Sequence, residues 1–130
     1  MTAQEKWVRT IYYMKLVCAN YTRIRKGEAY RITGGKDRRE IQEMRKWCRA
    51  IDRALRTLRL RKGKSAARAR RDWLVAHLIE SLMLGGEDGE RIRRDISGHY
   101  LLNRRYMDAM WKEAVAAVQK AAQEEGLLGE

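Results

Sequence analysis

The stretch that decides the fold runs from residue 41 to residue 58 and reads IQEMRKWCRAIDRALRTL. Its apolar residues follow one another at steps of three and four, at Ile41, Met44, Cys48, Ile51, Leu55 and Leu58. That spacing aligns them in a narrow stripe along one helix, as in the seam of a coiled coil. We therefore expect a helix here. Its seam would pack on a second copy of the chain or on an earlier helix as an antiparallel hairpin.

Helical patterns continue on both sides of this stretch. Thr2-Ala3-Gln4-Glu5 has the sequence of a capping box, and apolar residues then recur along one helical face up to Ile24. Further apolar patterns predict helices over residues 73–84, 88–97 and 103–121, and the chain contains no proline to interrupt them. The expected fold is all-α: an N-terminal helical hairpin with a coiled-coil-like seam, followed by a three-helix helix-turn-helix bundle.

Glycines suggest how the chain divides. Gly34-Gly35 separates the first two helices, and Gly63-Lys64-Ser65 marks a hinge before the third. We expect an N-terminal hairpin or arm over residues 1–62, a basic linker over 63–70, a helix-turn-helix-like bundle over 71–123 and a flexible tail over 124–130. The Ala-rich stretch 66–71 also allows a second interpretation, in which it extends the next helix.

Positive charge gathers in the middle of the chain. The formal net charge is +12, and residues 36–70 hold 14 basic and 4 acidic residues, with no acid between Asp52 and Asp72. A solvated helix face usually mixes both signs, because like charges one turn apart are mildly destabilising. The run therefore favours a surface that binds the phosphates of a nucleic acid. The expected contacts in this region are Arg45, Lys46, Arg49, Arg53, Arg56, Arg59, Arg61, Lys62, Lys64, Arg68, Arg70 and Arg71.

Residues 88–121 have the proportions of a helix-turn-helix, with its second helix beginning after Asn103. A recognition helix reads base edges in the major groove with side chains near its N-terminus, and arginine there can make a bidentate contact with guanine. The candidate base-reading residues are Arg104, Arg105, Asp108 and Lys112. Arg91, Arg93 and Arg94 on the preceding helix are further candidates for phosphate contacts.

The segment from Leu102-Asn103-Arg104-Arg105-Tyr106-Met107 to Trp111-Lys112-Glu113-Ala114 resembles the recognition helix of phage-encoded transcriptional regulators of the RinA and ArpU type. Those regulators are similar in turn to region 4 of sigma-70 factors. The resemblance covers roughly residues 71–122. It implies a sequence-specific DNA-binding regulator of phage or prophage genes, in which Arg104, Arg105, Asp108 and Lys112 contact DNA.

The residues that could carry catalysis or bind a metal are few, and we expect no enzyme, cofactor or metal site. His77 and His99 are the only histidines, and Cys18 and Cys48 fall on apolar helix faces, which suits small core residues. No cysteine or histidine spacing fits zinc, and no glycine pattern fits a nucleotide loop. The four tryptophans can all face inward. Base stacking on single strands by an exposed aromatic side chain, such as Tyr13 or Tyr30, is an alternative use of these residues.

The expected partner is duplex DNA. RNA is also possible as a ligand, as is a host RNA polymerase or another nucleoprotein complex as a partner. The chain could also form a homodimer. One alternative is a small phage or mobile-element protein that inhibits a host nucleoprotein complex, for example an anti-CRISPR. Another is a nucleic-acid packaging protein such as a terminase small subunit. No segment has the length of a membrane-spanning helix, and the first residues do not form a secretory signal, so we expect a cytoplasmic protein without a membrane partner.

Overall fold

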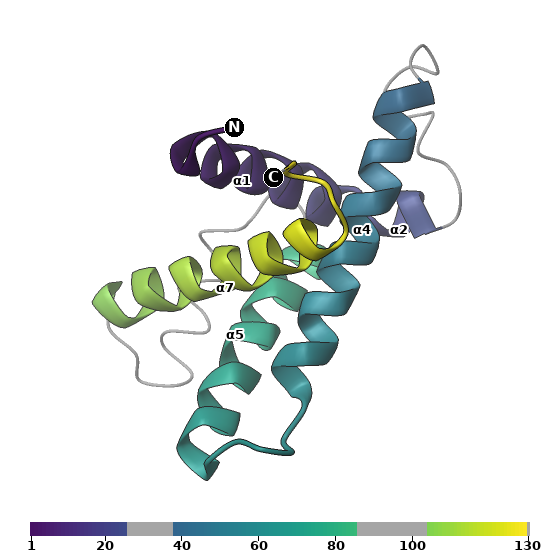
Figure 1. Ribbon diagram of the computed structural model, residues 1–130. Coiled ribbons are helices and arrows are strands. Elements are labelled where there is room, and N and C mark those ends of the chain that lie inside the picture. The colour runs from purple at the N-terminus through teal and green to yellow at the C-terminus, as the bar shows by residue number, and fades with distance from the viewer. Residues whose placement is uncertain (26–37, 86–103, 130) are drawn as a thin grey trace.

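The computed structural model (Figure 1) describes residues 1–25, 38–85 and 104–129. These residues form five helices: α1 (Ala3–Ala19), α2 (Tyr21–Arg25), α4 (Arg38–Arg59), α5 (Ala66–Gly85) and α7 (Arg104–Glu124). No strand occurs in these three ranges, which confirms the all-α prediction. The expected helix over residues 88–97 and the turn after it lie outside the described residues.

Helix α1 begins where the sequence predicts it. The Thr2 hydroxyl accepts a hydrogen bond from the Glu5 backbone N–H at 3.1 Å, and the Glu5 carboxylate accepts one from the Thr2 backbone N–H at 3.3 Å, which completes a capping box. The predicted continuation to Ile24 is interrupted at Asn20. Its side-chain amide donates to the Leu16 carbonyl, a local bond of the kind by which asparagine ends helices. Its own carbonyl then accepts the first hydrogen bond of α2, from Ile24.

Helix α4 buries far more than a narrow seam. The predicted seam residues are buried from Met44 onward, and Trp47, Ala50 and Ala54 are buried beside them. The buried face is wide because α4 contacts α1, α5 and α7 rather than one partner helix. The seam is therefore covered by the chain's own helices.

The N-terminal helices do not form a separate hairpin. Figure 1 shows α1 crossing α4, and α1 also contacts α5 and α7. Buried side chains from all of these helices belong to one hydrophobic core. The expected division at residue 62 therefore does not separate two cores, because α4 supplies apolar surface to both halves of the chain.

The antiparallel hairpin is instead formed by α4 and α5, which lie side by side in Figure 1. The turn between them uses Gly63 at φ 80°, a left-handed conformation that glycine adopts without a steric penalty. The Ser65 hydroxyl then accepts a hydrogen bond from the Arg68 backbone N–H at 3.1 Å and caps α5. Residues 66–70 are thus the start of α5, as in the second interpretation of that stretch, and the non-helical connection is short.

Helix α5 occupies a central position, as its apolar sequence indicates. It contacts α1, α4 and α7, and Val75, Leu78 and Ile79 are buried. The expectation that every tryptophan faces inward is wrong for Trp73, whose exposed fraction is 43%, whereas Trp47 is fully buried. Trp73 lies on the side of α5 turned away from the helices that cover Val75 and Ile79.

The expected flexible tail is held against the core. After α7, Gly126 adopts φ 76°, its N–H bonds to the Gln123 carbonyl at 3.1 Å, and the Leu127 N–H bonds to the Ala122 carbonyl at 2.9 Å. This pair of hydrogen bonds is a Schellman motif, which reverses the chain and usually brings the next apolar side chain onto the helix. Leu127 and Leu128 are accordingly buried.

We expect Leu128→Ala to lower the free energy of unfolding by about 2–5 kcal/mol, because the side chain has an exposed fraction of 0% and its removal leaves a cavity. The matched control is Leu60→Ala in the α4–α5 turn, where the exposed fraction is 61% and the change should stay within about 0.5 kcal/mol. Urea unfolding followed by circular dichroism measures both. If the two variants were equally stable, the packing of the C-terminal segment on the core would be contradicted.

Candidate nucleic-acid interface

The exposed side of α4 carries a row of arginines. Arg45, Arg49 and Arg56 are four and seven residues apart, so they project from the same side of the helix, and all three are exposed. They gather there because the wide buried face of α4 packs on α1, α2, α5 and α7. The row therefore lies on the solvent side of α4.

Other exposed cations extend this row beyond the end of α4. Arg61 and Lys62 lie in the turn, and Arg70 lies in the second turn of α5. None of these residues forms an ion pair within the described part of the chain. We call this set the cationic face: Arg45, Lys46, Arg49, Arg56, Arg61, Lys62 and Arg70.

Five of the predicted phosphate-binding residues have carboxylate partners inside the protein. Arg53 pairs with Glu124 at 2.6 Å and Glu125 at 3.1 Å, at the end of α7, and Arg59 pairs with Glu80 on α5. Lys64, Arg68 and Arg71 belong to a network of their own. The structure thus gives these five cations a role in packing the helices together.

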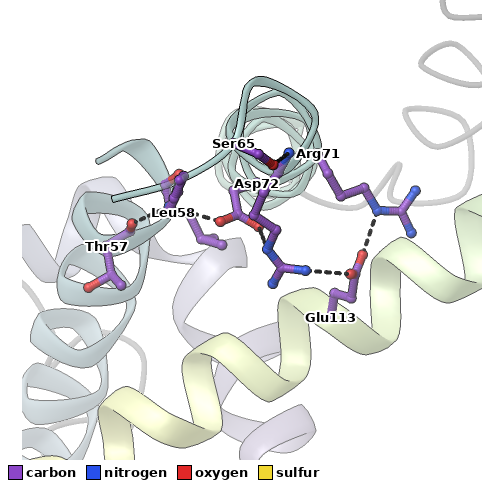
Figure 2. A network of polar contacts seen from close by, with 8 residues as sticks. Thr57, Leu58, Ser65, Arg71, Asp72 and Glu113 are labelled. Atoms are coloured by element: carbon purple, nitrogen blue, oxygen red, sulfur yellow. Dashed lines mark hydrogen bonds and ion pairs between the residues drawn. The ribbon is translucent and has the colours of Figure 1, made fainter. Parts of the chain in front are cut away.

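That network joins α4, α5 and α7 (Figure 2). Lys64 lies 2.8 Å from the Asp72 carboxylate and also donates to the carbonyls of Thr57 and Leu58 in the last turn of α4. A cation in this position stabilises a helix C-terminus. Asp72, with an exposed fraction of only 5%, also pairs with Arg68 at 3.1 Å. Its buried charge therefore has two partners.

The network extends from Asp72 to α7 through Glu113. Arg71 lies 2.7 Å from the Glu113 carboxylate, and Arg68 lies 3.9 Å from it. Figure 2 shows Glu113 reaching from α7 toward the first turns of α5. The carboxylates that neutralise these cations are therefore Asp72, directly after the basic stretch, and Glu113 on α7, far from it in the sequence.

Asp52, the last acid before the long basic run, also has partners inside the protein. It accepts a hydrogen bond from the Tyr21 hydroxyl at 2.5 Å and pairs with Arg25 at 3.1 Å. Burial and this hydrogen bond raise the pKa of Tyr21, so the hydroxyl stays protonated as a donor. Asp52 is thus shared with α2 and neutralises little of the arginine row beside it.

Three candidate base-reading residues lie on one side of α7. Arg105, Asp108 and Lys112 are exposed and are spaced three and four residues apart. The side chain of Arg104, and all of Arg91, Arg93 and Arg94, lie outside the described residues. Figure 1 shows α7 crossing α4 with its C-terminal half, while its first turns point away from α4. The structure therefore does not bring these residues together with the cationic face.

Sequence reasoning missed one aromatic pair on the surface. The rings of Trp73 and His77 stack on the outer side of α5, with centroids 5.3 Å apart and planes 7° apart. Arg70, Trp73 and His77 follow one another at steps of three and four, and this spacing was the signal that they share a helical face. By contrast Tyr13, an earlier candidate for base stacking, is partly buried and stacks on Trp47. Tyr30 lies outside the described residues.

The cysteines are core residues. Cys18 and Cys48 are free and buried, and burial raises their pKa values to about 12 and about 11. Both thiols are therefore neutral near pH 7. In the three described ranges, no group of three or more His, Cys, Asp or Glu is placed to hold a metal ion. His77 is partly buried beneath Trp73, and His99 lies outside these ranges.

Comparisons with known proteins give no further identification. A scan against protein-family models, a search of curated proteins and a search of solved structures each find no match to this chain. In the described part of the chain, no helix combines the length and apolar character needed to cross a membrane.

We expect Asp72→Asn to lower the free energy of unfolding by about 3 kcal/mol, because it leaves the Lys64 ammonium group without its buried carboxylate partner. Glu113→Gln removes the same charge from a partly exposed pair, and its cost should not exceed about 1 kcal/mol. Urea unfolding of both variants checks the difference. The assignment of Lys64 and Arg68 to packing fails if the two substitutions cost the same.

Proposed function

We propose that this chain binds nucleic acid through the phosphate backbone, with the cationic face as the contact surface. The observation that carries the proposal is that all seven members of this face are exposed and form no ion pair within the described residues. Holding like charges together costs free energy unless a polyanion neutralises them. A nucleic acid releases condensed counterions when such a surface binds it, and this release drives association.

Ion pairing elsewhere on the molecule argues against an ordinary solvated face. Where acids lie within reach of cations they pair with them, as Glu43 does with Arg9 and Asp72 does with Lys64. The acids of α4 that flank the cationic face in the sequence already have partners inside the protein, since Glu43 pairs with Arg9 and Asp52 is bound by Tyr21 and Arg25. The contrast supports a surface whose counter-charge comes from another molecule.

A more specific form of the proposal is a DNA-binding regulator of phage or prophage genes in which α7 reads the major groove. Its support is that Arg105, Asp108 and Lys112 share one exposed side of a 21-residue helix. It also rests on the resemblance of this segment to RinA- and ArpU-type regulators. In this form the cationic face holds phosphates, and the first turns of α7 supply sequence preference.

The first test replaces two arginines of the cationic face. We expect Arg49→Ala/Arg56→Ala to weaken binding to every duplex sequence and to flatten the plot of log K against log salt by roughly 1.8, because each lost phosphate contact removes about 0.9 from the slope. Fluorescence anisotropy over a salt series measures this change. Lys15→Ala/Arg23→Ala is the matched control, since it removes the same charge from exposed positions on α1 and α2. Equal effects of the two double variants would show that net charge, and not this face, drives binding.

The second test concerns α7. Selection of duplexes from a random pool should yield a preferred sequence, and Arg105→Ala should weaken binding to that sequence by about 1–3 kcal/mol while leaving random duplex almost unaffected. Lys120→Ala, near the other end of the same helix, is the matched control. Reading by α7 is wrong if the wild-type protein selects no sequence, or if Arg105→Ala weakens both duplexes equally.

A further inference from the structure

The solvent side of α1 is a narrow strip with an apolar centre. Beyond its first turn, the exposed residues of α1 follow one another at steps of four, three and four: Val8, Tyr12, Lys15 and Ala19. This is the spacing of a coiled-coil seam. An exposed helix face usually carries charged and polar side chains. Val8 and Tyr12 are instead apolar, and each has an exposed fraction of 55%.

The apolar centre of this strip is already ordered. Helices α4, α5 and α7 contact α1, which lies at an edge of the bundle in Figure 1. The ring of Tyr12 meets that of Tyr13 edge to face, at 5.1 Å between centroids, and Tyr13 in turn stacks on the buried Trp47. A side chain held in this way loses little freedom when a second surface covers it. Val8 lies one turn before Tyr12, so the two side chains are neighbours on the helix surface.

Opposite charges flank the apolar centre. Glu5 lies three residues before Val8, Lys15 lies three residues after Tyr12, and both charged residues are exposed. Lys15 forms no ion pair within the described part of the chain. The Glu5 carboxylate accepts a hydrogen bond from the Thr2 backbone N–H, and a carboxylate can accept several more. Both charges can therefore pair with groups of another molecule.

The strip is complementary to itself when it is reversed. Thr10 lies midway in the sequence between Glu5 and Lys15, and it also lies midway between Val8 and Tyr12. A second copy can lay its α1 antiparallel to the first, with a twofold axis at the level of Thr10. Glu5 of each copy then faces Lys15 of the other, and Val8 of each copy faces Tyr12 of the other. A parallel pair would place like charges opposite each other, which is unfavourable.

We propose that this strip is a homodimer interface, in which two copies of the chain pair antiparallel through α1. The inference goes beyond the proposed function and does not depend on it. The seam of α4 is covered by the chain's own helices, whereas α1 presents a similar spacing to solvent. An unrelated protein would have to carry the same pattern in reverse, which a second copy supplies by symmetry.

The length of α1 sets the expected strength of the dimer. A helix of 17 residues is about 25 Å long. A contact confined to one strip of that length lies at the small end of specific interfaces, so we expect a dissociation constant on the order of 0.1 mM. The protein is then monomeric when dilute and dimeric when concentrated.

The test exchanges the charges at the two ends of the strip. Glu5→Lys and Lys15→Glu should each self-associate about 10-fold more weakly than wild type, because two attractive pairs become repulsive. A mixture of the two variants should dimerise about as well as wild type, since each lysine then faces a glutamate and the mean net charge is unchanged. Sedimentation equilibrium without nucleic acid, at about 0.01–1 mM protein, measures these associations.

The matched control is Lys62→Glu in the α4–α5 turn, which lies away from α1 in Figure 1. It changes the net charge exactly as much as Lys15→Glu does and should dimerise as wild type does. Glu5→Lys also breaks the capping box of α1, but the comparison of Lys15→Glu with Lys62→Glu leaves that cap intact.

Three results would overturn the inference. One is wild-type protein that stays monomeric at about 1 mM. Another is equal dimerisation of Lys15→Glu and Lys62→Glu, and the third is a mixture of Glu5→Lys and Lys15→Glu that associates no better than either variant alone. Each of these results leaves the binding of nucleic acid by the cationic face as it was, because no nucleic acid is present in the experiment.

Discussion

Burial of α4 from three sides is the constraint on which the rest of the structure depends. Helices α1, α5 and α7 all pack on it, and Trp47, Met44 and Ile51 are completely enclosed. An amphipathic helix covered this widely keeps only a narrow strip of its circumference in water. All of its basic side chains that lack an internal partner must share that strip. The concentration of charge is therefore a consequence of the packing, and α4, which is buried on most sides, also presents the candidate binding surface.

Local signals in the sequence predicted the local structure well. The capping box of Thr2 and Glu5 and the apolar spacing from Met44 to Leu58 each depend on residues within a few turns of one another. Ion pairs between residues far apart in the sequence could not be predicted from such local spacing. Whether Lys64 or Arg71 faces solvent depends on Asp72 and Glu113, and the second of these belongs to another helix. The basic run was thus recognised from the sequence, but its division into structural and free cations was not.

The difference between local signals and contacts between distant residues also explains where the structure departs from the other sequence predictions. Apolar residues around most of α5 predicted a central helix, but only the placement of its neighbours decides that Trp73 is left on the outside. The C-terminal segment shows the opposite case. Gly126 and the two leucines after it form a short polar-flanked segment that resembles a frayed end in sequence. The reversal at Gly126 nevertheless brings both leucines onto the core. Composition predicts what a segment can bury, and packing determines whether it does.

The ion pairs of Arg53 link the end of α7 to the charge of α4. Glu124, the last residue of α7, and Glu125 after it neutralise this arginine directly before the reversal at Gly126. A change that loosens this reversal would release an additional cation beside the arginine row while weakening the core. At this end of the molecule, stability and attraction to polyanions therefore change in opposite directions. A substitution there that makes the protein bind phosphates more strongly is expected to make it easier to unfold.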